Sequence, residues 1–405
     1  MAKLTHNAKV ALKIGTLCSV AYFAVYISRN ILSAVTPIMV KAGYTEEYIG
    51  EISSLFLIMY AVGQLINGLI GDRIRANYMI GFGLLFSGVM NLVFPYLVDS
   101  PLGATVVYGL AGFFLSMIYG PMTKVVAEST EPPYTTRCSL GYTVASFLGS
   151  PAAGLLAIFM SWQGVFHTGS IILILMSISI FTFFAILERG GVVKYGERKR
   201  GEKNKGDIRI LFSRGIVRFS LISICTGIIR TSVVFWLPTY IAQYLEFGEE
   251  RAIGIFSVAT IVLTSASFIT IFVYEKLFHS DMDKTILLML SVSALFFLLT
   301  FLFPAPAINI VFIVLAIMGS GGAATMLWSR YCPSLKDTGL VSGATGFLDF
   351  LSYGASALGN LCFSYAIKTI GWKWLILVWL GVVVVGIIAS VLPMFTKTLR
   401  PFSTL

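Results

Sequence analysis

The sequence predicts an all-α membrane protein with twelve transmembrane helices in two pseudo-symmetric halves of six. Composition, a series of long apolar stretches and an internal repeat support this fold class. Of the 405 residues, 57% are hydrophobic and only 12% are charged, and the mean hydropathy is +0.86. Soluble domains carry about 25% charged residues, which cover the surface around their core. This chain has too few for that, so lipid must contact most of its surface.

The composition also argues against several functional classes. The net charge is +10, but the basic residues lie between apolar stretches and form no basic face, so we expect no nucleic-acid partner. The five cysteines lack metal-ligand spacing, which predicts neither a metal site nor a disulfide framework. No nucleophile–base pair or phosphate-binding loop occurs, and no histidine stands at catalytic spacing from a cysteine or carboxylate. We therefore expect a protein that is not an enzyme and needs no cofactor.

Twelve stretches are long enough to cross a bilayer, which takes about 20 apolar residues per helix. The first six are Val10–Val40, Ile49–Ile70, Tyr78–Val98, Leu102–Val126, Cys138–Met160 and Gly164–Leu187. The second six are Ile216–Tyr244, Ile253–Leu277, Thr285–Phe303, Ala307–Leu327, Val341–Ile367 and Trp374–Met394. Lys3, Lys9 and Lys13 mark the start of the first stretch, whose apolar run is too long for a cleavable signal.

The one long polar segment, 188–209, separates the two sets. It contains eight basic and four acidic residues, a pattern typical of a solvated linker. The predicted organisation is an N-terminal half (1–187), a cytoplasmic linker (188–209) and a C-terminal half (210–405).

The basic residues also predict the orientation. With both termini in the cytoplasm, 23 of the 29 Lys and Arg fall in cytoplasmic segments. Four fall outside (Lys41, Arg251, Lys368, Lys373) and two, Arg29 and Arg230, fall within spans. The opposite orientation would invert this bias, so we expect a multi-pass protein of the cell membrane with both termini inside.

An internal repeat relates the halves. Span one contains Arg29-Asn-Ile-Leu-Ser-Ala-Val-Thr-Pro37 and span seven contains Arg230-Thr-Ser-Val-Val-Phe-Trp-Leu-Pro238. Further short matches follow in the same order, Ile49-Gly50 with Ile253-Gly254 and Ser161-Trp162 with Gly371-Trp372. Six-plus-six parallel repeats of this kind indicate a two-half transporter.

The two intramembrane arginines suggest an anion site. Arg29 lies twelve residues before Lys41 and Arg230 twelve residues after Arg218, which places each ~18 Å from a helix end. A charged side chain at such depth costs at least ~2.5–3.5 kcal/mol. Asp349, the one acid near a mid-span position, cannot neutralise two distant arginines. If the repeat brings spans one and seven together, two guanidiniums meet at one depth and favour a carboxylate or phosphate. The alternative is a structural Arg–carboxylate pair.

Neighbouring side chains extend this candidate site. Tyr26 and Tyr22 share a helical stripe with Arg29, and Gln64 and Tyr353 are further candidate ligands; packing is the alternative for each. Asp349 could hold an arginine between substrates or take up a coupling proton.

A second candidate region is the loop after span two, Gly68-Leu-Ile-Gly71-Asp72-Arg73-Ile-Arg75. Asp72, Arg73 and Arg75 at a helix end could pair with a neighbouring helix end and lock one conformation, which predicts a gating role. An ordinary positive-inside loop is the alternative.

At these residues the chain resembles the major facilitator superfamily, and within it the organophosphate:phosphate antiporters. The resembling pieces are the loop motif above, Tyr26-Ile-Ser-Arg29-Asn30 with Pro37, Arg230 with Trp236-Leu-Pro-Thr-Tyr240, and Ser352-Tyr353-Gly354. The resemblance implies the major facilitator fold and a substrate phosphate held by Arg29 and Arg230. It also implies a pocket lined by Tyr22, Tyr26 and Tyr353, and exchange of an organic phosphate for inorganic phosphate.

The sequence departs from that family at three places. Asn30 and Gln64 stand where the family often has lysines, and the fifth span has Ser146 or Leu148 where well-studied members have a histidine. The site therefore carries less positive charge, which keeps a carboxylate substrate open.

We expect a monomeric secondary transporter of a small organic anion, embedded in the bilayer and coupled to inorganic phosphate or a proton. Three alternatives remain: a proton-coupled carboxylate or sugar-acid symporter, a drug or metabolite exporter, and a transporter-like sensor that binds an anion without moving it.

Overall fold

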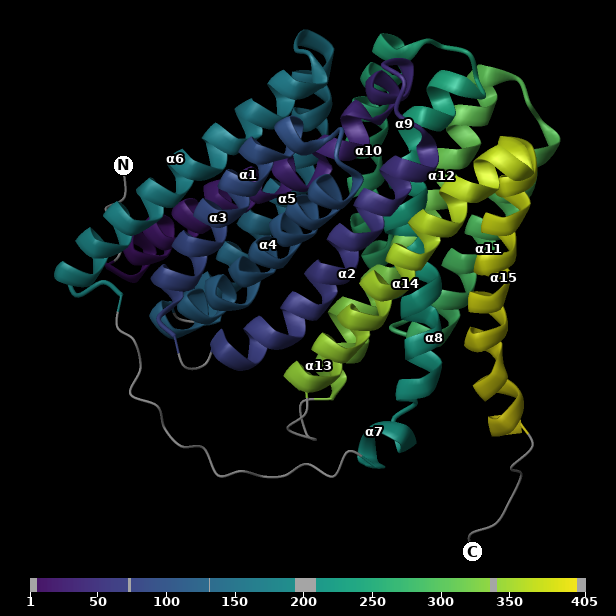
Figure 1. Cartoon of the computed structure of the whole chain (residues 1–405). Coiled ribbons are helices and arrows are strands. Elements are labelled where there is room, and N and C mark those ends of the chain that lie inside the picture. Colours follow the sequence, from purple (N-terminus) through teal and green to yellow (C-terminus); the bar gives the residue numbers. More distant parts are fainter. Residues whose placement is uncertain (1–5, 72–73, 131, 194–208, 336–340, 399–405) are drawn as a thin grey trace, which may run out of the picture. The chain divides into compact units, whose positions relative to one another are not determined.

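The computed structural model is helical, with no strand among the residues it describes, which are 6–71, 74–130, 132–193, 209–335 and 341–398 (Figure 1). The helices before the linker are α1 His6–Lys41, α2 Glu46–Gly71, α3 Ala76–Leu97, α4 Pro101–Ser129, α5 Pro132–Phe159 and α6 Trp162–Arg189. Those after it are α7 Arg209–Ser213, α8 Ile216–Gly227, α9 Val234–Gln243, α10 Glu249–Phe272, α11 Met282–Leu302, α12 Pro306–Met326, α13 Cys332–Ser334, α14 Val341–Thr369 and α15 Gly371–Thr398. Three π-helical segments, η1 Ile228–Val233, η2 Val273–Leu277 and η3 Leu327–Tyr331, continue α8, α10 and α12.

Each predicted span coincides with a helix. Within the described residues, ten helices are long and apolar enough to cross a membrane. The fifth and eleventh predicted spans fall on α5 and α14, which are not among these ten, so the total of twelve and the orientation remain predictions. Predicted spans seven and eight contain the π-helical segments η1 and η2, and η3 begins where predicted span ten ends, at Leu327. Helix α6 continues to Arg189 and α7 begins at Arg209, and most of the predicted linker (194–208) lies outside the described residues.

Side-chain caps explain where several helices begin. The Ser100 hydroxyl accepts a hydrogen bond from the Gly103 amide at the start of α4, and Ser161 does the same for Gly164 at the start of α6. Asp281 accepts from the Lys284 amide at the start of α11. Each cap satisfies an amide that has no partner within its own helix.

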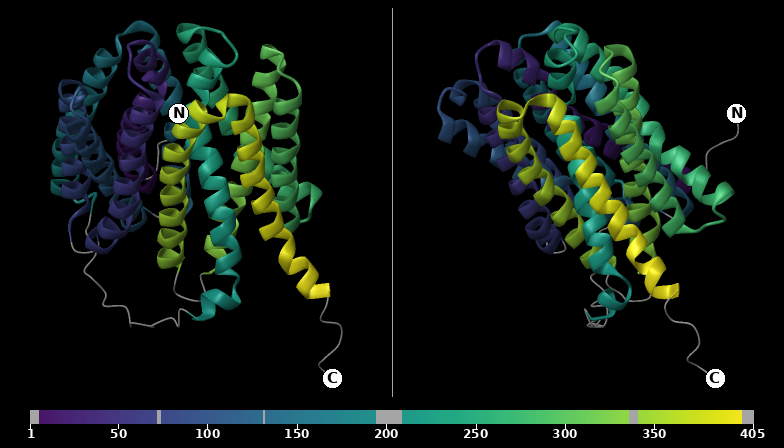
Figure 2. Two further views of the ribbon diagram at one scale, coloured as in Figure 1. Left: turned by 45° about the vertical axis from the view of Figure 1, so that its right-hand side comes forward. Right: turned by 90° about the vertical axis from the view of Figure 1, so that its right-hand side faces the viewer.

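The chain forms two compact units. One consists of residues 1–203 with 249–261, and the other of 204–248 with 262–405. In the first unit α1 packs on α5, α2 on α4, and α3 on α4 and α6. In the second, α11 packs on α12 and α15, and α8 packs on α14 and α15 (Figure 2).

Small and polar side chains let the helices of the first unit approach closely. The Ser170 and Ser177 hydroxyls on α6 donate to the carbonyls of Gly88 and Gly81 on α3, at 2.7 and 2.8 Å. The Asn91 amide donates to the Ser28 hydroxyl at 2.7 Å and ties α3 to α1. Such contacts are the usual cohesion between helices in lipid, where burial of apolar surface gives no net driving force.

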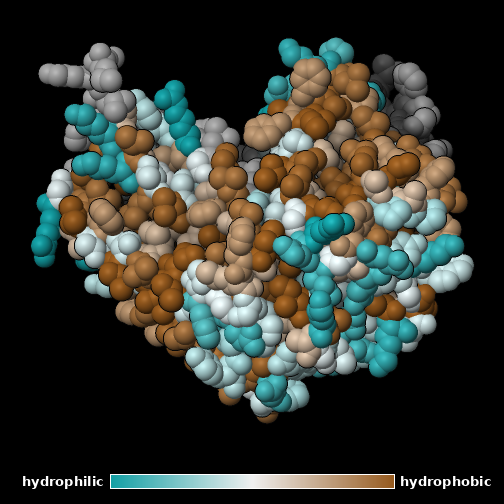
Figure 3. Space-filling model, turned by 90° about the horizontal axis from the view of Figure 1, so that it is seen from above, coloured by the Kyte–Doolittle hydropathy of each residue, from teal (hydrophilic) through white to brown (hydrophobic). Residues whose placement is uncertain are grey.

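Large apolar side chains are exposed on the outside of the helices. Leu102 and Phe159 are 77% and 82% exposed, and many other large apolar residues are more than one third exposed. Hydrophobic residues lie among hydrophilic ones on the face seen from above in Figure 3. A soluble protein rarely exposes apolar patches of this extent, so this surface fits a lipid environment, as the composition predicts.

Candidate functional site

Arg29 lies in the middle of α1 and is only partly exposed. Its guanidinium carbon is 4.8 Å from the centroid of the Tyr60 ring on α2 and 5.5 Å from that of Tyr26, one turn earlier on α1. Cation–π contacts of this kind are worth about 0.5–2 kcal/mol each. They offset part of the cost of an intramembrane charge.

A cluster of four tyrosines, Tyr22, Tyr26, Tyr119 and Tyr142, continues from Arg29. The Tyr22 ring lies 5.0 Å from Tyr26, 5.5 Å from Tyr119 on α4 and 6.0 Å from Tyr142 on α5. Tyr119 and Tyr142 are 6.3 Å apart. The predicted stripe of Tyr22, Tyr26 and Arg29 is therefore one side of an aromatic cluster built by three helices.

Glycine on α5 makes this arrangement possible. A Cβ atom at Gly149 would lie 2.3 Å from the Tyr26 Cβ and 2.7 Å from the Tyr26 carbonyl carbon. Only a residue without a side chain permits α5 to approach the Tyr26 turn this closely.

Asn30 bonds to the backbone of its own helix. Its side-chain amide donates to the backbone carbonyl of Tyr26 at 2.6 Å, within its own helix. Gln64 is partly exposed and lies one turn beyond Tyr60 on α2. Positions 30 and 64 thus both carry neutral amides.

The backbone conformation at Arg230 differs from that at Arg29. It lies in η1, a π-helical turn between α8 and α9, and its side chain is exposed. π-Helical turns inside α-helices are rare and frequently occur at functional sites.

A seam of small residues holds η1 against α14. The Ser232 hydroxyl donates to the Ser356 carbonyl at 2.7 Å. A Cβ atom at Gly227 would lie 2.9 Å from the Cα of Ser352. The next residue of α14 after Ser352 is Tyr353, which is buried, and Asp349 lies one turn earlier and is partly exposed. The predicted residues Arg230, Tyr353 and Asp349 therefore come from two directly packed elements of the second unit.

The family model of the Major Facilitator Superfamily matches residues 18–359. The chain belongs to this superfamily. This assignment confirms the prediction that the chain is a multi-pass membrane transporter and not an enzyme.

Two relatives and one solved structure refine this placement. The chain is 21% identical to the glycerol-3-phosphate transporter of Bacillus subtilis (strain 168), over 87% of this chain and 85% of that protein. It is 34% identical over 76 residues to the membrane sensor protein UhpC of Salmonella typhimurium, 18% of this chain and 17% of that one. A crystal structure of a bacterial homologue of the human lysosomal transporter Spinster, in an inward-facing and unoccupied conformation, matches with a TM-score of 0.77, 12% identity and full coverage of both chains. This last match supports the major facilitator fold.

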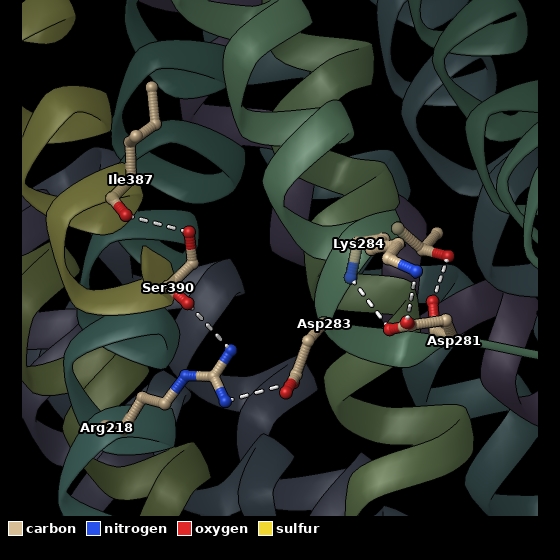
Figure 4. A network of polar contacts seen from close by, with 7 residues as sticks. Arg218, Asp281, Asp283, Lys284, Ile387 and Ser390 are labelled. Carbon is tan, nitrogen blue, oxygen red and sulfur yellow. Dashed lines mark hydrogen bonds and ion pairs between the residues drawn. The ribbon is translucent and has the colours of Figure 1, made fainter. Parts of the chain in front are cut away.

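Away from Arg29 and Arg230, the second unit of this major facilitator chain contains a network of polar contacts around Arg218 (Figure 4). Arg218 on α8 lies 2.9 Å from Asp283 on α11 and donates to the Ser390 carbonyl on α15 at 3.1 Å. The Arg218 side chain is 13% exposed. One guanidinium thus joins three helices, whereas in the first unit the Asn91–Ser28 contact is neutral.

The predicted gating residues fall at the edge of the described chain. Asp72 and Arg73 lie outside the described residues, and Arg75 is exposed immediately before α3. At the C-terminal end of α1, Lys41 pairs with Glu249 at 3.1 Å. That pair attaches the first turn of α10 to α1 within the first unit.

Three tyrosines of this region, Tyr60 beside Arg29 and Tyr119 and Tyr142 beside Tyr22, are not among the site residues predicted from the sequence. Tyr60 is on α2, Tyr119 on α4 and Tyr142 on α5, so none shares a helical stripe with Arg29. Each is a tyrosine within an apolar span, but that signal is common in membrane helices, where tyrosine also serves in packing.

Proposed function

We propose that this major facilitator transporter exchanges an organic phosphate for inorganic phosphate by alternating access. The observation that carries the proposal is Arg29, an intramembrane guanidinium positioned by the faces of Tyr26 and Tyr60. Guanidinium donors suit phosphate oxygens, which they bind bidentately. The glycerol-3-phosphate transporter relative, matched over 85% of its length, supports the phosphorylated substrate class.

We propose that Arg29 on α1 and Arg230 in η1 are both phosphate-binding residues, since each carries guanidinium donors suited to phosphate oxygens. Tyr22, Tyr26 and Gln64 in the first unit and Tyr353 in the second are proposed as uncharged substrate-binding residues. We further propose that Asp72, Arg73 and Arg75 gate the cytoplasmic side.

Asp349 is proposed as the coupling residue of the alternative mechanism, proton-coupled symport of a carboxylate or sugar acid. A carboxylate on the helix that packs against η1 could neutralise an arginine after proton release. Net uptake that needs a pH gradient and no internal phosphate would support symport, and its loss in Asp349→Asn would identify the proton site.

The test of the exchange proposal is counterflow in liposomes containing the purified full chain. Liposomes loaded with unlabelled phosphate should accumulate labelled phosphate in the wild type, and the Arg29→Gln and Arg230→Gln variants should lose it. Arg251→Gln, which removes an exposed arginine at the start of α10, is the matched control and should exchange normally. Absence of exchange by folded wild-type protein would refute the proposal.

A second candidate function is anion sensing without transport. It is favoured by the 34% identity over 76 residues to the membrane sensor protein UhpC. Saturable phosphate binding by calorimetry, together with no counterflow under any loading condition, would support the sensor.

A further inference from the structure

The tyrosine cluster contains two members, Tyr119 and Tyr142, that no comparison assigns to a role. They come from α4 and α5 and contact Tyr22 of α1. All four rings of the cluster lie within the first compact unit.

Exposure within the cluster is uneven. Tyr22 and Tyr142 are 8% and 4% exposed, whereas Tyr119 is 40% exposed. Gly120, next to Tyr119, has open space where a Cβ atom would lie. Tyr119 is therefore the exposed ring of these three, and it packs on the two buried rings of Tyr22 and Tyr142.

This exposed surface differs from the apolar outer face of α4. Val106, 44% exposed, lies thirteen residues before Tyr119, which at 100° per residue turns Tyr119 about 140° away around the helix. Phe113 and Met117 are near the direction of Val106 by the same geometry. Tyr119 instead turns toward α1 and α5, where Tyr22 and Tyr142 lie.

The cluster begins beside Arg29. Tyr26 contacts both the Arg29 guanidinium and the Tyr22 ring, at 5.5 and 5.0 Å. Along α1, Tyr22 and Arg29 are separated by about 10 Å. That separation is comparable to the length of a phosphorylated molecule of a few carbons, so one substrate could reach from Arg29 to the cluster.

The chemistry of the cluster suits an uncharged polyol. Aromatic faces pack on the C–H surfaces of a carbon chain, and phenolic hydroxyls can donate to or accept from its hydroxyls. The rings supply no positive charge, so they offer little to inorganic phosphate beyond what Arg29 provides.

We propose that Tyr119, supported by Tyr22 and Tyr142, is the specificity-determining contact for the polyhydroxylated carbon skeleton of the substrate. The inference rests on the proposed phosphate exchange. It predicts that the cluster separates organic phosphates from inorganic phosphate, while the arginines bind the phosphate group that both share.

The test uses phosphate counterflow by the full chain, with inhibition by glycerol 3-phosphate, glucose 6-phosphate and unlabelled phosphate. In Tyr119→Ala and Tyr119→Leu, the half-inhibitory concentration of the organic phosphates should rise about tenfold relative to that of phosphate. Tyr119→Phe keeps the ring and should change the ratio less. Tyr96→Ala, which removes a tyrosine 73% exposed on α3, is the matched control and should leave the ratio unchanged.

The outcomes separate the two proposals. Wild-type exchange with an unaltered ratio in both Tyr119→Ala and Tyr119→Leu would overturn the role of Tyr119 alone. An equal loss of affinity for organic and inorganic phosphate would also overturn it, because it would indicate a structural role. Absence of wild-type exchange would overturn the proposed function and this inference together.

Discussion

Arg29 and Arg230 occupy matching positions in the two sequence repeats, but their surroundings differ. Arg29 lies in an uninterrupted α-helix and contacts two tyrosine rings. Arg230 lies in a π-helical turn that rests on the small residues of α14. The first arginine is held by its side-chain contacts and the second by the geometry of its backbone. The two sequence repeats therefore share an arginine at the same position along the helix, but different contacts surround it in each repeat.

The units also differ in their polar contacts. In the first, hydroxyl and amide groups join α3 to α1 and α6, and the Asn77 amide on α3 donates to the Glu188 carboxylate on α6 at 2.9 Å. In the second, the Arg218 guanidinium joins α8, α11 and α15. Charged contacts are stronger but leave a larger penalty when one partner is removed.

The largest expected effect is on the arginines themselves. Arg29→Lys and Arg230→Lys keep the charge but remove the bidentate fork, so each should reduce phosphate exchange on the order of 100-fold. Counterflow rates at saturating and subsaturating phosphate measure this loss. A strong loss in only one variant would break the proposed equivalence of the two arginines in binding.

The next largest effect is expected on stability, from substitution of Gly149 and Gly227, where two helices approach closely. Gly149→Ala and Gly227→Ala each place a Cβ within 3.0 Å of backbone atoms of the facing helix, and overpacking of this kind costs about 1–3 kcal/mol. Thermal unfolding in detergent should show lower midpoints for both. Gly381→Ala, where nothing lies within 4 Å of the added Cβ, is the control and should be neutral or stabilising. Destabilisation by Gly381→Ala as large as theirs would contradict the steric explanation.

The ion-pair network tests the difference in polar contacts. Arg218→Gln leaves the Asp283 carboxylate, 26% exposed, without its cation and should lower the free energy of unfolding by about 1–3 kcal/mol. Ser28→Ala removes the hydroxyl that Asn91 contacts and should cost less, about 0.5–1.5 kcal/mol. Denaturant unfolding of both variants compares them directly. Equal losses would mean that charge adds nothing to the cohesion of the second unit.

The smallest effect is expected at Lys41 and Glu249. Their side chains are 69% and 32% exposed, and exposed pairs contribute about 0–1 kcal/mol. Lys41→Met, Glu249→Gln and the double variant form a cycle in which unfolding measures the coupling energy. A coupling well above 1 kcal/mol would show that this pair stabilises α10 on α1 more than its exposure implies.

The amino-acid sequence by itself determined the membrane class, the position of every long helix and the two intramembrane arginines. These features follow from local composition. A bilayer requires about 20 apolar residues per helix, and a charged residue within such a stretch is rare and easily recognised. Tertiary structure decided which side chains surround those arginines. Tyr60, Tyr119 and Tyr142 approach the α1 stripe from three other helices, and the π-helical turn at Arg230 appears only where η1 packs on α14. Helix–helix packing depends on which faces meet in three dimensions, and the periodicity of one helix does not specify the face of another.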